Sequence, residues 1–177
     1  MKGAFRRAAL AALSFVAFDT LTVDANRPPW RSDASLKSLF LKHRNDFQTL
    51  VAMAKEDVHL TRIAPDFTAL DDDVSWPRKN VGISEERWNA YKKLFQSVNA
   101  PKGITNDIGN SRVLFPIVLA GMVPAGFEKG LVYSATPLSP VLRSLDERPP
   151  KQYWDDRGHV LVYKQIEDHW YIYFEQW

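Results

Sequence analysis

The sequence predicts an α+β fold in which N-terminal helices pack on one face of a C-terminal, mostly antiparallel sheet of about four strands. Residues 36–58 and 88–98 carry apolar side chains at helical spacing, and residues 113–177 carry short branched or alternating runs separated by turn residues. Helices that precede strands favour segregated layers over an alternating α/β fold. A chain of 177 residues with 45% apolar residues fits one domain, which we place at residues 26–177.

Residues 1–25 are predicted to be a secretory signal peptide. Lys2, Arg6 and Arg7 precede an uninterrupted run of apolar or small residues at 8–18, and small or branched residues stand at Val23 and Ala25. The run is too short to span a bilayer, which needs about 20 apolar residues. An amphipathic helix packed on the domain and a retained anchor are the alternatives. A signal implies a periplasmic or secreted protein with no stable membrane anchor after cleavage.

The first structured element is expected to be one long helix. Two prolines at positions 28 and 29 keep residues 26–31 extended. Ser32 or Ser35 is expected to cap the helix, because apolar side chains recur at spacings of three and four from Leu36 to Val58. The helix is expected to run to about His59.

A second helix is expected to begin at Ser84. Glu85 and Glu86 lie in its first turn, where the helix dipole favours acidic side chains. Residues 99–103 are expected to end it. The segment between the two helices, residues 61–79, has no regular pattern and is expected to be an irregular loop.

Strands are expected at residues 113–120 and 130–135, where branched apolar residues cluster. Pro116 lacks a backbone donor, so it is expected at a sheet edge or a bulge. Ser139 and Pro140 are expected to open a short helix that ends near Leu145.

The chain is expected to end in a β-hairpin with strands at residues 159–167 and 170–177. A three-residue loop at residues 167–169 places Val160, Val162 and Ile166 on one face with Trp170, Ile172 and Phe174. Such a loop usually ends in a left-handed residue, which histidine tolerates better than most residues.

The opposite hairpin face would carry Tyr163, Tyr171 and Tyr173. If that face is open, these aromatic side chains are candidates for partner binding. The alternative is that the row packs under a helix or under the proline-rich segments. The acidic run at Asp71, Asp72 and Asp73 is a second candidate contact, for a basic partner surface, although a solvated loop is its simpler interpretation.

Enzyme signatures are missing from the sequence. The chain has no cysteine, no nucleophile elbow, no phosphate-binding glycine loop and no metal-binding histidine pair, so no cofactor or metal is expected. The net charge of +2 is too small to indicate nucleic-acid binding. The hypothesis that remains is a small exported, non-enzymatic binding protein, for example an inhibitor or an immunity factor. The alternative is a small hydrolase with an unrecognised site.

Overall fold

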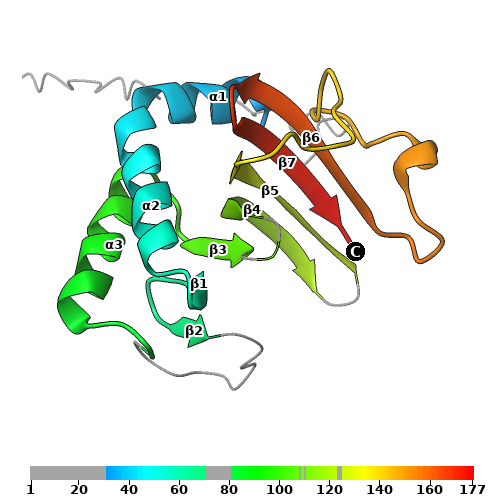
Figure 1. Ribbon diagram of the computed structural model, residues 1–177. Helices are drawn as coiled ribbons and strands as arrows, with labels where there is room; N and C mark the ends of the chain where they lie inside the picture. The colour runs from blue at the N-terminus through cyan, green and yellow to red at the C-terminus, as the bar shows by residue number, and fades with distance from the viewer. Residues whose placement is uncertain (1–30, 71–80, 108, 110, 123–124) are drawn as a thin grey trace, which may run out of the picture.

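A computed structural model of the chain describes residues 31–70, 81–107, 109, 111–122 and 125–177, with backbone only at positions 122 and 125. Three helices and one sheet make up this part of the protein, so the α+β class is confirmed (Figure 1). The prediction of about four strands is wrong, because the sheet has seven strands in the order β2-β1-β3-β4-β5-β7-β6. Every neighbouring pair of strands is antiparallel. The predicted signal peptide lies outside the described residues.

The predicted long helix is in fact two helices, α1 (Asp33–Lys42) and α2 (Arg44–Glu56). Ser32 caps α1 as predicted, since its hydroxyl accepts a hydrogen bond from Ser35 N. The break falls at His43, whose N–H donates to both Leu39 O and Phe40 O. It turns α2 away from α1 (Figure 1) and brings Phe40 and Phe47 onto the same ring, Trp170, at centroid distances of 4.8 and 6.0 Å. The break contains neither glycine nor proline. Tertiary packing therefore outweighs the local helical pattern at this point.

The helix α3 (Glu85–Ser97) begins and ends close to the predicted positions. Ser84 accepts a hydrogen bond from Arg87 N, so the expected N-cap is confirmed. The indole of Trp88 donates to Ala64 O at 2.8 Å, which anchors α3 beside the first strands of the sheet.

Three short strands were not expected from the sequence. They are β1 (Leu60–Ile63), β2 (Thr68–Leu70) and β3 (Ile104–Asp107). The prediction of an irregular loop at residues 61–79 is wrong for its described part, because β1 and β2 form a hairpin there. β1 also pairs with β3, so the sheet continues beneath α2 and α3 (Figure 1).

The longest hairpin joins β4 (Arg112–Met122) to β5 (Ala125–Ser134) in the middle of the sheet. The register shifts between Pro116 and Val118, so the proline lies at a bulge, as one of its two predicted alternatives required. Its partner, Gly130, has no room for a side chain. A Cβ atom there would lie 2.1 Å from Phe115 O.

The terminal hairpin consists of β6 (Val160–Glu167) and β7 (Trp170–Gln176). Val162 pairs with Phe174, so the predicted grouping of faces is confirmed. The loop is shorter than predicted, because Glu167 pairs with Trp170. A bulge after Gln165 shifts the register by one residue, so the two apolar rows still share one face. His169 has a φ of 65°, the left-handed conformation expected at the end of the turn.

Residues 135–150 wrap around β6 instead of forming the predicted helix. Pro140 O accepts from Tyr163 N, and Leu142 N donates to Tyr163 O. The helix prediction for residues 139–145 is wrong because these backbone groups are bonded to a strand. A single 3₁₀ turn, η2 (Lys151–Tyr153), then leads into β6.

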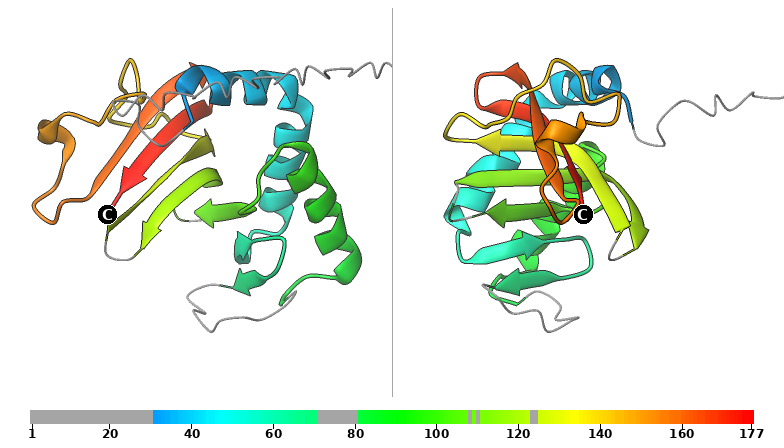
Figure 2. Two further views of the ribbon diagram at one scale, coloured as in Figure 1. Left: turned by 180° about the vertical axis from the view of Figure 1, so that it is seen from behind. Right: turned by 90° about the vertical axis from the view of Figure 1, so that its right-hand side faces the viewer.

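Two apolar clusters lie on the two faces of the sheet, which twists so that β6 and β7 cross the direction of β1–β3 (Figure 2). The front cluster is shared by all three helices and the sheet. The smaller back cluster contains Val132, Tyr163, Tyr171 and Tyr173, with Leu138 packed against it.

Candidate functional site

The tyrosine row predicted for partner binding is buried. Tyr163, Tyr171 and Tyr173 are 3%, 4% and 0% exposed, respectively. Leu138, from the wrapping segment, packs on them. Of the two alternatives for this row, the open face is therefore wrong, and packing under a proline-containing segment holds. A partner would reach these rings only if residues 135–142 moved away. Asp71, Asp72 and Asp73 lie outside the described residues and stay a prediction.

The hydroxyl groups of two of these tyrosines bind charged neighbours on the back face. Tyr163 OH accepts a hydrogen bond from Arg112 Nη1 at 2.8 Å, and Tyr173 OH donates to Glu128. Burial, reinforced by the Glu128 carboxylate, raises the pKa of Tyr173 well above its ordinary value. These hydroxyls are held in internal hydrogen bonds.

Glu128 and Glu175 form a carboxylate pair on this face, because they are direct partners in the β5–β7 register. Glu175 Oε1 lies 3.0 Å from His159 Nε2. Burial raises the pKa of Glu128, and neither its hydrogen bond from Tyr173 nor the charge of Arg62 cancels that effect. One carboxyl thus has a raised pKa while the other is paired with a histidine.

A second ionic cluster is closed within the front of the molecule. Lys129 on β5 is 0% exposed, and its Nζ lies 2.8 Å from both Leu145 O and Asp33 Oδ1. Asp33 Oδ2 lies 2.9 Å from Lys164 Nζ and accepts from Leu145 N at 2.8 Å. Burial opposes the ionisation of Asp33, but the hydrogen bond from Leu145 N and the two ammonium groups hold its pKa below the ordinary value. We name Asp33, Lys129, Asp146 and Lys164 the buried clamp.

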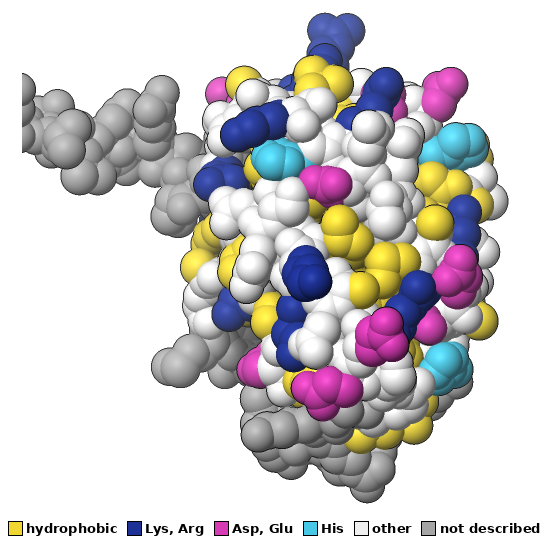
Figure 3. All heavy atoms as spheres, turned by 90° about the vertical axis from the view of Figure 1, so that its left-hand side faces the viewer, with side chains coloured by type: hydrophobic (Ala, Val, Ile, Leu, Met, Phe, Trp, Pro, Cys, Tyr) yellow, Lys and Arg dark blue, Asp and Glu magenta, His cyan; other side chains and the backbone are white. Residues whose placement is uncertain are grey.

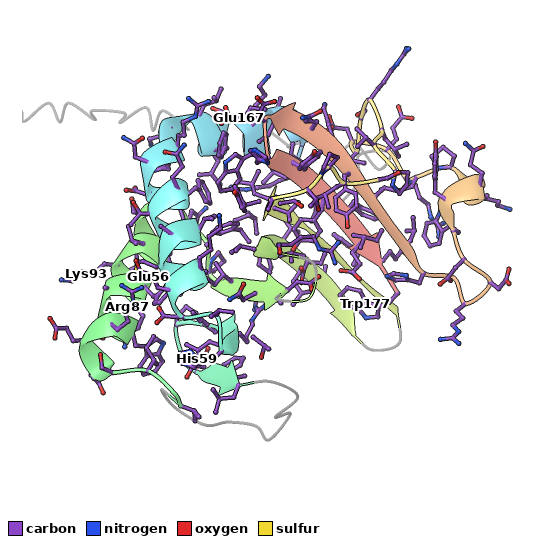
Figure 4. All side chains as sticks on the ribbon, in the orientation of Figure 1. Glu56, His59, Arg87, Lys93, Glu167 and Trp177 are labelled. Carbon is purple, nitrogen blue, oxygen red and sulfur yellow. The ribbon has the colours of Figure 1, made fainter. Side chains whose placement is uncertain are left out.

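A third cluster joins α2 to α3. Arg87 bonds Asp57 Oδ2 through Nε at 2.9 Å and Glu56 through Nη2 at 2.7 Å, and Figure 4 shows Glu56 and Arg87 side by side between these helices. Tyr91 OH donates to the same Asp57 oxygen at 2.8 Å. Burial and this hydrogen bond raise the pKa of Tyr91 well above its ordinary value. The cluster fixes α3 on the end of α2.

Two adjoining hollows follow the open side of α2, and we name them together the α2 seam. The first has a volume of about 320 Å³ and lies between α2 and the β6–β7 turn; its lining is Gln48, Val51, Ala52, Lys55, Tyr133 and residues 167–170. The second has a volume of about 290 Å³ and is more apolar; its lining is Ala54, Lys55, Val58, Asn106, Ser111, Val113 and Ala135. Lys55 belongs to both, so the hollows meet at its side chain.

The side chains around the seam are of mixed character. Lys55 Nζ lies 3.1 Å from Tyr133 OH and 4.5 Å from the centroid of that ring. Val58 is 48% exposed, which is high for a large apolar side chain. Figure 3, which views the side where α2 and α3 lie, shows positive and negative side chains interspersed with hydrophobic ones.

The described part of the chain contains no group of three or more histidine or acidic side chains placed to hold a metal ion. None of its helices is long and apolar enough to cross a membrane.

Sequence reasoning missed Asp33, Lys129 and Lys55 as notable residues. An apolar stretch that contains a lone lysine, as around Lys129, is a weak signal of a buried pair. Nothing local identifies its partner, because Asp33 reads as an ordinary first-turn acid of a helix. Lys55 reads as one solvated residue of α2, and only the assembled sheet makes it the meeting point of two hollows.

Comparison with known proteins yields no match, whether with protein-family models, with curated proteins or with solved structures.

Proposed function

We propose that this chain is a small exported binding protein that acts on a protein partner, as an inhibitor or an immunity factor does. The observation that carries the proposal is the α2 seam, which combines two open hollows with the exposed cation Lys55. Sites that bind proteins commonly join apolar pockets to a few polar groups.

The proposal that the protein is exported rests on the sequence of residues 1–25. Cleavage after Ala25 is compatible with the buried clamp, whose first residue is Asp33. A chain that begins at Asn26 keeps Ser32, which caps α1, and Asp33, which pairs with Lys129. Mass spectrometry of the protein recovered from its compartment tests this part of the proposal. A mass that corresponds to a start at Asn26 is expected, and a full-length mass in the cytoplasm would contradict it.

Binding is tested by affinity capture of the purified protein from extract, followed by reconstitution of each captured complex from two purified components. We expect a one-to-one complex that survives purification. If no captured protein reconstitutes and the chain has hydrolase activity, the proposal is overturned.

A small hydrolase is the second candidate, and the carboxylate pair on the back face favours it. A carboxyl whose surroundings raise its pKa, next to a second carboxyl, is a usual arrangement for a general acid and its companion. Glu128, with a raised pKa, would donate the proton, and Glu175, its cross-strand partner beside His159, would be the companion carboxyl. Glycoside and ester substrates are the test, with the variants E128Q and E175Q. An activity that both variants abolish while their circular dichroism stays unchanged would favour this candidate.

A further inference from the structure

We infer that the α2 seam binds a segment of a protein partner in which a carboxylate side chain stands beside an apolar side chain. This inference rests on the proposed binding function and specifies the chemistry of the partner. Its basis is the donors of the first hollow, the acceptors on its rim and the lining of the second hollow.

The first hollow has free donors at Lys55 and Tyr133. In the described part of the chain, the sole hydrogen-bond partner of Lys55 Nζ is Tyr133 OH, and no carboxylate lies within ion-pair distance. An ammonium group has three N–H donors, so two remain for a ligand. The tyrosine oxygen accepts from Lys55, which leaves its own O–H to donate. A carboxylate seated here would receive charge-assisted hydrogen bonds from both side chains.

The acidic residues of the rim do not fill this position. Glu167 is paired with Arg44, which balances its charge. Asp168 and His169 are exposed in the β6–β7 turn, and His169 Nδ1 lies 3.0 Å from Ser134 O. The donors therefore lie at Lys55 on α2 and Tyr133 on β5, and the acceptors lie in the β6–β7 turn. This polarity suits an extended segment whose carboxylate contacts Lys55 and whose backbone N–H groups point to the turn.

The second hollow supplies the apolar half of the site. Ala54, Val58, Val113 and Ala135 line it, and the exposed part of Val58 adds apolar surface at its mouth. A volume of about 290 Å³ lies just below the usual range for ligand pockets, so the hollow suits a side chain. Because Lys55 borders both hollows, the carboxylate and the apolar side chain must be neighbours in the bound segment.

The test uses two blocked peptides, acetyl-Gly-Glu-Leu-Gly-amide and its Gln counterpart, titrated into the ¹⁵N-labelled protein and followed by NMR. We expect shifts concentrated at residues 51–58 and 133–135, with the Glu peptide bound about fivefold more tightly than the Gln peptide. K55Q should remove this preference. K92Q is the matched control, because Lys92 on α3 also lies over an aromatic ring, 3.8 Å from the centroid of Trp88, and it should keep the preference.

Equal affinities of the two peptides, shifts elsewhere on the protein or an unchanged preference in K55Q would each overturn the inference. Sedimentation of the free protein addresses a second copy as the occupant. If the wild type forms a concentration-dependent dimer and K55Q does not, the occupant of the α2 seam is a second copy of this chain, and the inferred partner segment is wrong. The inference and the proposed function fail separately. If a reconstituted partner binds K55Q as tightly as it binds the wild type, the α2 seam is not the binding site, but the proposed binding function stands.

Discussion

Replacing Lys129 with methionine should destabilise the protein strongly, because the buried carboxylate of Asp33 would lose the ammonium group that neutralises it. Breaking a buried ion pair by removing one partner costs about 3–5 kcal/mol. We expect about 3 kcal/mol for K129M, at the lower end, because Lys164 Nζ stays 2.9 Å from Asp33 Oδ2. Asp33 Oδ1 accepts no hydrogen bond of regular geometry from the described residues, so the ammonium group alone balances it.

The pairing itself is measured by a double-mutant cycle with D33N. D33N should also cost about 3 kcal/mol, since it leaves Lys129 buried beside Leu145 O and Asp146. The double variant K129M/D33N removes both charges and should cost about 3 kcal/mol in total, which gives a coupling energy of about 3 kcal/mol. Urea unfolding followed by tryptophan fluorescence provides the free energies. K37M, at an exposed position of α1, is the control and should change the free energy of unfolding by less than about 0.5 kcal/mol.

Acid unfolding gives an independent check of the same clamp. The pKa of Asp33 is lower in the folded protein than in the unfolded chain. Its contribution to stability is therefore present above the unfolded pKa of about 3.9 and is lost as the pH falls through the folded value. D33N should remove this part of the pH dependence.

The double-mutant cycle has a clear contrary outcome. If the costs of K129M and D33N add within about 0.5 kcal/mol in the double variant, the coupled clamp is refuted.

Three further substitutions test other parts of the fold. G130A should cost more than about 3 kcal/mol or prevent folding, because its Cβ would meet a backbone oxygen of β4 at 2.1 Å, whereas G109A, with nothing within 4 Å, should change the melting temperature little. Y91F should lower the free energy of unfolding by about 1–2 kcal/mol, since it removes the 2.8 Å hydrogen bond to Asp57, and an unchanged urea midpoint would contradict this. Burial raises the pKa of Glu128, so the wild type should lose stability relative to E128Q as the pH rises from about 4, and parallel pH profiles of the two proteins would refute that assignment.

The elements predicted correctly are those that local chemistry determines. Ser32 and Ser84 cap helices because a hydroxyl three residues before a free N–H is enough to bond it. The faces of the terminal hairpin follow from the alternation of its side chains and from a turn that tolerates a left-handed histidine at position 169.

The elements missed depend on partners far along the chain. The strands β1, β2 and β3 have four, three and four residues, too few for a visible alternation. Arg62 on β1 pairs with Thr105 on β3, and α3 lies between these two strands along the chain. No local pattern therefore reveals this pairing. The break at His43 follows from aromatic packing on Trp170 and has no local breaker.

The candidate site could be anticipated only in part. Alternation along β6 and β7 correctly placed Tyr163, Tyr171 and Tyr173 in one row, but no local pattern shows that residues 135–142 would cover it. The α2 seam depends on two segments of sheet meeting one helix, so Lys55 acquires its position from the assembled fold.

The attachment of residues 140–142 to Tyr163 also bears on how copies of this protein meet. β6 ends the sheet on one side, and the outer backbone groups of an end strand are a template for another chain. Here Pro140 O and Leu142 N already occupy those of Tyr163, and Val141 forms a parallel bridge to it. The opposite end strand, β2, has only three residues. A strand that pairs with β6 at Tyr163 therefore has to displace the wrapping segment, and the edge at the other end of the sheet is very short.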